Sequence, residues 1–281
     1  MPIPGKSSNG APPVISIITP VFNGSAYLDE LIQSIFNQDY TNFEHIIIDD
    51  GSRDNDATIN ILKKYPHLRW WSRENKGQQY TMNEGIRAAK GSIISVISSD
   101  DLYADKSVFS KIINHFNEKP DLDWLYGKTL TIDHQSRIKE FGPTKRKEPF
   151  PVWYIKHSLP IYHCSLFFKK EFIVKNNLYF DESFKYAADW DWVIRLVNFG
   201  KFGFINEILS MYRIHINQTS QKTKQRILTS EVQRIVKSHR LNKVTYHFLL
   251  AKHRLMKVLW IIRNKGLSGL MNDFKVWYKH Q

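Results

Sequence analysis

Ile93-Ile94-Ser95-Val96-Ile97-Ser98-Ser99-Asp100-Asp101 joins an apolar, β-branched run to two adjacent carboxylates. Buried strands of parallel sheets resemble its first half. Ligands of open α/β sheets bind at the carboxyl ends of the strands, and neighbouring carboxylates repel unless their charge is compensated. A divalent cation such as Mg²⁺ or Mn²⁺ would compensate it, whereas Asp101 could instead form a turn or cap a helix. This stretch alone does not separate the two interpretations.

The first hundred residues alternate between apolar runs and amphipathic segments. The apolar runs are predicted as strands, and the segments with apolar residues at helical spacing are predicted as helices between them. Strands separated by single helices predict a parallel, doubly wound sheet. We expect the strands at 14–18, 44–49, 68–72 and 93–97 and the helices at 25–38, 54–64 and 78–90.

The region after residue 103 is less regular. Its prolines and basic residues predict a mobile loop at 141–151. We expect strands at 123–132, 164–168 and 202–212 and helices at 169–175 and 189–199.

Length and composition limit the class of protein. A chain of 281 residues can form one large domain or two smaller ones around a substantial core. Cys164 is the single cysteine, which excludes an internal disulfide and a thiolate metal cluster. The chain has no run of roughly 18 apolar residues, the length of a membrane span. Residues 1–13 are polar and lack the apolar core of a signal peptide, so we expect a cytoplasmic start.

The positive charge is concentrated in the tail. The formal net charge is +13, and residues 222–281, with 14 Lys and Arg against 2 acidic residues, carry +12 of it. Apolar residues recur at helical spacing from 232 to 262, and Trp260, Trp277 and Tyr278 add aromatic anchors. This pattern predicts a basic amphipathic helical extension that contacts an anionic membrane surface. The alternative is a helical hairpin that packs against the preceding domain and exposes its basic face to solvent.

Polar residues follow each of the four predicted strands, at 19–24, 49–52, 75–78 and 98–101. In a parallel sheet these four tips lie at one edge. Phe22 can offer a ring face to a base, Asp50 can accept a hydrogen bond from it, and Gly77 at a helix start leaves N–H groups for phosphate. Each residue taken singly is equally explained by a turn or a cap, but the set is typical of a nucleotide pocket.

The sequence resembles the inverting glycosyltransferases of family 2, which have the GT-A fold. The matching segments are 16–23, 48–52, 75–78, 82–91 and 98–103, followed by weaker matches at 163–170, 187–195 and 212–215. The resemblance covers roughly residues 14–220, and the basic tail lies outside it. It implies a Rossmann-like α/β fold with a mixed, mainly parallel sheet flanked by helices. We expect a catalytic domain at 14–221, with a nucleotide-sugar half at 14–103 and an acceptor half at 104–221, between a flexible start at 1–13 and the helical tail at 222–281.

The resemblance also implies the donor and the cofactor. The donor would be a nucleotide sugar, most often a UDP-sugar, and Mn²⁺ or Mg²⁺ would stabilise the leaving diphosphate. Ser98 stands where many relatives carry another acid, so the metal site is an Asp-Asp version of the motif. The implied metal ligands are Asp100, Asp101 and His215. The implied donor residues are Pro20, Phe22, Asn23, Asp50, Gly77, Gln78, Asn83 and Asp100.

Inversion requires a group that takes the proton of the acceptor hydroxyl. Asp189 matches the family's base position and heads a predicted helix, whose dipole favours the ionised carboxylate. Asp191 is the second choice for this base. The alternative role for Asp189 is that of a helix cap without a catalytic function. His163, Trp190 and Asp191 are the residues we expect near the acceptor, although Trp190 could equally belong to the core.

These expectations describe an inverting glycosyltransferase that moves a hexosyl or N-acetylhexosaminyl group to a hydroxyl of a glycan or lipid-linked glycan. Such an enzyme would serve cell-surface polysaccharide synthesis at the inner face of the cell membrane. One rival is a nucleic-acid-binding protein that uses the basic tail, but no such motif occurs and no nucleic-acid partner is expected. The other rival is an inactive sugar-nucleotide binder, which the intact Asp50, Asp100, Asp101 and Asp189 disfavour.

Overall fold

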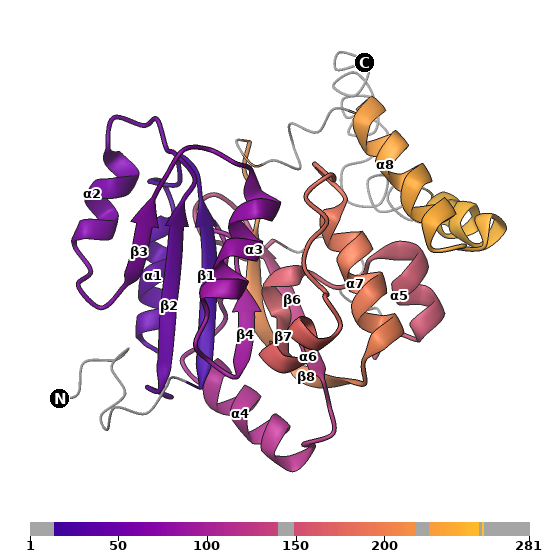
Figure 1. The fold of residues 1–281 in the computed structure, drawn as a ribbon, viewed down its shortest axis with the longest axis horizontal. Coiled ribbons are helices and arrows are strands. Elements are labelled where there is room, and N and C mark those ends of the chain that lie inside the picture. The colour runs from indigo at the N-terminus through magenta and orange to yellow at the C-terminus, as the bar shows by residue number, and fades with distance from the viewer. Residues whose placement is uncertain (1–13, 140–148, 217, 219–224, 253–254, 256–281) are drawn as a thin grey trace.

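A computed structural model describes residues 14–139, 149–216, 218, 225–252 and 255 of the chain (Figure 1). Eight strands form one sheet in the order β3-β2-β1-β4-β7-β6-β8-β5. The strands are β1 Ile15–Val21, β2 Phe43–Asp49, β3 Arg69–Ser72, β4 Ile93–Val96, β5 Leu102–Tyr103, β6 Trp124–Ile132, β7 Leu166–Lys169 and β8 Phe202–Arg213.

The sheet is mixed and mainly parallel, as predicted. Strands β3, β2, β1 and β4 pair in parallel, and so do β6 and β8. The pairs β4–β7, β6–β7 and β5–β8 are antiparallel. The parallel half arises because single helices return the chain to the same end of the sheet. The carboxyl ends of β1, β2 and β4 therefore lie at one edge (Figure 1).

Helices cover both faces of the sheet. Successive side chains of a strand point to opposite faces of the sheet and pack into two apolar cores. In β2, Ile46 and Ile48 belong to one core and Ile47 to the other. One core holds the buried faces of α3 and of α5 to α8, and the other holds those of α1 and α4. The helices are α1 Leu28–Phe36, α2 Ala57–Lys63, α3 Gln78–Ala88, α4 Val108–Glu118, α5 Val152–Ser158, α6 Lys170–Lys175, α7 Ala188–Phe199 and α8 Gln225–Ser238, with a 3₁₀ turn at His163–Ser165.

The structure differs from the expected elements in several places. Strand β1 continues to Val21, and α1 begins only at Leu28 because residues 25–27 form a turn. Helices α4 and α5 and strand β5 were not predicted. The strand expected at 164–168 begins at Leu166, after the 3₁₀ turn. Most of the loop expected at 141–151 lies outside the described residues.

The described part of the basic tail packs against the domain. Helix α8 lies beside α7, and residues 243–252 continue as a second helix (Figure 1). Ile235, Val236 and Leu241 join the same core as α7. Residues 256–281, which include the three aromatic anchors, lie outside the described residues. None of the described helices combines the length and the apolar character needed to cross a bilayer.

Candidate active site

A cavity of about 800 Å³ opens at the carboxyl ends of β1, β2 and β4. Seven of the eight predicted donor residues lie on its wall, and Asn83 does not. They come from segments far apart in the chain, and the sheet brings them together at one edge. The seven are Pro20, Phe22, Asn23, Asp50, Gly77, Gln78 and Asp100.

Phe22 and Asp50 present a ring and a carboxylate to this first cavity. Phe22 is 48% exposed, unusually open for a phenylalanine that follows a buried strand. The Asp50 carboxylate is fixed by three donors: the guanidinium of Arg73 and the backbone N–H groups of Lys76 (2.8 Å) and Gly77 (3.0 Å). A carboxylate has about four lone-pair sites, so acceptor capacity remains for a ligand N–H.

Gly77 lies at the N-cap of α3 and on the wall of the first cavity, where N–H groups for a phosphate were expected. Its N–H donates to Asp50 Oδ2 and is therefore not free for a phosphate. Its φ of 94° lies in the region that favours glycine, and it lets the chain turn from the Asp50 contact into α3. Asn23 is likewise held in the turn network, since its side chain accepts the N–H of Arg53 at 2.6 Å.

Asn83 is a structural residue rather than a wall of the cavity. Its side chain is 1% exposed and exchanges two hydrogen bonds with the backbone of Phe180, at 2.9 and 2.8 Å. A third bond joins its amide to Glu182 at 2.9 Å. Asn83 thus ties α3 to the segment before α7, which explains why it cannot reach a donor in the first cavity.

Asp100 and His215 form a pair on the wall of the first cavity. His215 Nε2 lies 2.8 Å from Asp100 Oδ2, and both side chains are partly exposed. One carboxylate and one imidazole suit Mn²⁺ or Mg²⁺ when substrate phosphates and water complete the coordination. The residues present therefore fit such a cation, although no group of three or more His, Cys, Asp or Glu side chains in the described residues forms a complete metal site.

Asp101 does not lie on this wall, in contrast to the expected metal ligand. It is fully buried, and its Oδ1 accepts the backbone N–H of Arg213 at 3.0 Å. Burial, and then the charge of Asp100, raise the pKa of Asp101 well above the usual range of a carboxyl. Within the described residues its Oδ2 has no hydrogen-bond partner. Asp101 therefore bonds to the end of strand β8 at Arg213 and does not face the first cavity.

Arg213 is a residue that the sequence analysis missed. It is fully buried and donates to the carbonyl oxygen of Asp100 at 2.8 Å and to Glu30 at 2.6 Å. Its guanidinium also lies over the ring of Tyr27, 4.4 Å from the centroid. Arg213 thereby holds the Asp100–Asp101 turn in place. The family match at 212–215 contains both Arg213 and His215, but only the fold reveals the partners of Arg213.

Asp189 lies in the first turn of α7 and is partly exposed to the first cavity. Desolvation by the surrounding protein raises the pKa of Asp189, an effect opposed by the nearby His163 and the N–H of Trp190. His163 lines the same cavity, and its Nε2 lies 3.1 Å from Ser98 Oγ. Asp189 therefore combines access to the cavity with a carboxylate that binds a proton more readily than an exposed one.

Asp191 does not lie on the wall of the first cavity. Its two oxygens are engaged by Arg195 (2.8 Å) and His239 (2.7 Å), and it is 6% exposed. These partners lower the pKa of Asp191, although burial acts in the opposite direction. Both oxygens of Asp191 are thus engaged by side-chain partners, and the residue does not lie on the wall of either cavity that Asp189 lines, in contrast to the expected position near an acceptor.

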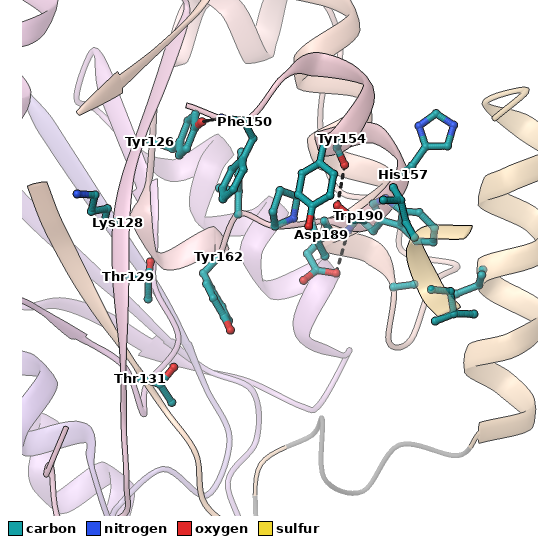
Figure 2. Close-up of a pocket in the computed structure, with 18 of the residues that line it drawn as sticks. Tyr126, Lys128, Thr129, Thr131, Phe150, Tyr154, His157, Tyr162, Asp189 and Trp190 are labelled. Atoms are coloured by element: carbon teal, nitrogen blue, oxygen red, sulfur yellow. Dashed lines mark hydrogen bonds between the residues drawn. The ribbon is translucent and has the colours of Figure 1, made fainter. Parts of the chain in front are cut away.

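A second cavity of about 820 Å³ meets the first one at Asp189 (Figure 2). Asp189, Tyr186 and Leu228 lie on the walls of both cavities. Figure 2 shows aromatic side chains around this space, among them Trp190, which was expected near the acceptor. Trp190 is largely buried, and its indole N–H donates to the carbonyl oxygen of Lys156 at 3.0 Å.

The profile of glycosyl transferase family 2 matches residues 16–173, more than half of the chain. The chain belongs to this family. A glycosyltransferase of Rickettsia typhi is 34% identical over 214 residues, which are 74% of this chain and 66% of that protein. The chondroitin synthase of Escherichia coli is 29% identical over 217 residues, which are 75% of this chain and 30% of the synthase. The chain thus spans less than two thirds of the length of these relatives.

Solved structures give the same fold. The crystal structure of S. aureus TarS in complex with UDP-GlcNAc aligns with a TM-score of 0.66 and 21% identity, over 81% of this chain and 66% of that one. The GT-A fold expected from the sequence is therefore confirmed. The edge of the sheet that carries Asp50 and Asp100 belongs to a glycosyltransferase fold.

Proposed function

We propose that this chain is an inverting, metal-dependent glycosyltransferase that uses a nucleoside diphosphate sugar, most often a UDP-sugar. The observation that carries the proposal is the position of Asp189 on the walls of both cavities. A base at such a junction can reach an acceptor in one cavity while the donor occupies the other. Residues 14–103 would supply most of the donor side, and 104–221 most of the acceptor side.

The first cavity is the donor site in this proposal. The ring of Phe22 stacks on the base, and the fixed Asp50 carboxylate accepts a base N–H. Asp100 and His215 would hold Mn²⁺ or Mg²⁺, which when bound neutralises charge on the leaving diphosphate. The similarity to TarS, which was crystallised with UDP-GlcNAc, supports a uridine nucleotide.

Asp189 acts as the general base. The acceptor oxygen attacks the anomeric carbon from the face opposite the diphosphate, and its proton passes to the Asp189 carboxylate. The bond between the anomeric carbon and the diphosphate oxygen breaks with its electron pair on the nucleotide. Because attack and departure occur on opposite faces, the configuration at the anomeric carbon inverts.

The acceptor is a hydroxyl of a glycan or a lipid-linked glycan, and the transferred group is a hexosyl or N-acetylhexosaminyl unit. Similarity to the chondroitin synthase supports a role in polysaccharide synthesis. We place the enzyme in the cytoplasm, peripherally attached to the inner face of the cell membrane. The net charge of +12 on residues 222–281 and the exposed Val244, Phe248 and Leu255 (78%, 64% and 58%) support contact with anionic lipid.

A panel of nucleotide sugars tests this function. We expect UDP or a UDP-sugar to raise the melting temperature of the full chain in the presence of Mn²⁺, and to raise it less with EDTA. Release of UDP from the stabilising donor should depend on the metal. If no nucleoside diphosphate or nucleotide sugar binds, with or without metal, the proposal is overturned.

A further inference from the structure

The C-terminal extension, which we define as residues 225–252, follows the region of roughly 14–220 that resembles the family. The family profile itself ends at residue 173, before both α7 and the extension. The extension contacts the segment that carries Asp189. Helix α8 runs beside α7 and approaches its N-terminal end (Figure 1). Helix α8 of the extension therefore contacts the start of the helix that carries the proposed base.

Glu231 on α8 makes the main contact. Its carboxylate accepts three consecutive backbone N–H groups, from Lys185 (2.6 Å), Tyr186 (2.9 Å) and Ala187 (3.0 Å). Glu231 is 6% exposed, so these bonds satisfy a buried charge. Helix α7 has Ala187 at its N-cap and no side-chain cap of its own. Glu231 supplies the missing anionic partner at the positive end of the α7 dipole, two residues before Asp189.

Further contacts join the same elements. His239 lies 2.7 Å from Asp191 Oδ1 on α7. The guanidinium of Arg234 lies over the ring of Phe184, 3.5 Å from the centroid. The extension thus contacts both ends of the segment from 184 to 191. These specific contacts distinguish it from a tail that merely exposes its basic face to solvent.

The extension also builds one wall of the second cavity. Leu228 and Val232 on α8 and Tyr246, Leu249 and Leu250 on the next helix line it. The ring of Tyr246 stacks on Trp190 with centroids 5.8 Å apart and planes at 27°. Without this wall, the cavity beside Asp189 would be open to solvent on the α8 side.

The rest of the lining indicates what the second cavity takes. The rings of Tyr126, Phe150 and Tyr154 face it together with the hydroxyls of Thr129 and Thr131 (Figure 2). Apart from His157, the titratable groups on its described wall are the tyrosines, Lys128 and Asp189. A pyranose offers an apolar C–H face to a ring and hydroxyls around its rim, so aromatic walls with scattered hydroxyls match an uncharged sugar.

We propose that the C-terminal extension completes the acceptor side of the active site, with Glu231 positioning the segment that carries Asp189 and Tyr246 closing a cavity for the ring of an uncharged sugar acceptor. This inference rests on the proposed function and names its acceptor class. Glu231 is a positioning residue, since it acts through the backbone of 185–187 and touches no reacting atom.

The first arm of the test substitutes Glu231 in the full chain. With the stabilising UDP-sugar, Glu231→Ala should lower kcat at least about tenfold while the donor KM changes less than about threefold. Glu231→Gln keeps an acceptor oxygen without the charge and should recover part of the loss. Gln233→Ala, an exposed change on the same helix, is the matched control. If Glu231→Ala does not fold, Glu231→Gln decides, and a kcat within about twofold of wild type overturns the positioning role.

The second arm measures binding of p-nitrophenyl glycosides to the UDP-loaded protein by ligand-detected NMR. Glycosides of uncharged hexoses and N-acetylhexosamines should bind, and Tyr246→Ala should lower their affinity at least about fivefold. Val244→Ala, 78% exposed on the same helix, should not change the affinity. If the glycosides do not bind, or bind the Tyr246 variant as tightly as wild type, the cavity assignment is overturned. If the wild-type protein does not bind UDP, that result would instead count against the proposed function itself.

Discussion

Asp100 and His215 are separated by 115 residues in the chain, yet His215 Nε2 lies 2.8 Å from Asp100 Oδ2. Strand β8 ends at Arg213, whose buried guanidinium binds the carbonyl oxygen of Asp100. The sheet thus carries a carboxylate and an imidazole to one edge, where Asp101 supports the turn from below. This arrangement separates the two adjacent acids into a cavity-facing one and a buried one.

Substitution of each acid tests that separation. Asp100→Asn and His215→Ala should weaken Mn²⁺-dependent UDP binding at least about tenfold, because each removes a group facing the cavity. Asp101→Asn should retain the Mn²⁺ dependence, because its carboxylate bonds to the backbone of Arg213 instead. Calorimetric titration of each variant with UDP, with and without Mn²⁺, measures the affinity for UDP and its dependence on the metal. Equal loss of the Mn²⁺ dependence in all three variants would show that Asp101 is a ligand after all.

Asn83→Ala separates a structural role from donor binding. The change removes three hydrogen bonds between α3 and the 180–182 segment, two of which are buried. We expect the free energy of unfolding to fall by about 1–3 kcal/mol, with the donor KM unchanged. Denaturant titration and steady-state kinetics check the two parts. A raised donor KM in a variant of wild-type stability would place Asn83 in the donor site.

Acid stability depends on His45, which is buried in β2 beside Thr19, with 3.0 Å between His45 Nε2 and Thr19 Oγ1. Burial, with a smaller effect of His67, lowers the pKa of His45 to about 3. Between pH 6.5 and about 3 the unfolded chain binds a proton that the folded protein excludes, so His45 makes stability fall as pH falls.

His45→Gln removes this proton-binding site. The slope of unfolding free energy against pH should become shallower below pH 6.5, by up to about 1.4 kcal/mol per pH unit. Chemical denaturation at several pH values provides the comparison, and above pH 7 the two curves should run parallel. An unchanged slope in the variant would mean that His45 is not the group responsible.

The stereochemical outcome tests the reaction class. Attack opposite the leaving diphosphate predicts that a donor with an α-linked sugar gives a β-linked product. Proton NMR of the product resolves the anomeric coupling constant. An α-linked product would show that the acceptor does not replace the diphosphate in a single displacement from the opposite face, and would contradict the proposed mechanism.

Much of the first half could be predicted from the sequence because each element there buries a complete apolar pattern. Ile46, Ile47 and Ile48 already indicate a strand buried on both faces, and the polar tips follow from the parallel topology. Helix α4 was missed, although Val108, Phe109, Ile112 and Phe116 have helical spacing and are all buried.

The site was less predictable, because its residues take their roles from distant partners. Gly77 bonds to Asp50 rather than offering a free N–H, and Asn83 is used by Phe180, 97 residues away. Glu231 has no sequence pattern that connects it with Ala187. Spacing along the chain identifies candidates, but hydrogen-bond partners across the fold decide which of them face a ligand.

The Asp189→Asn variant separates proton transfer by Asp189 from binding of the donor. In one preparation, UDP affinity and the rate of sugar transfer are measured for the wild-type protein and for this variant. We expect kcat to fall at least about 100-fold, because the amide cannot take the acceptor proton, while the Kd for UDP stays within about threefold. A variant that binds UDP normally and keeps more than about a tenth of the wild-type kcat would contradict the role of Asp189 as the base.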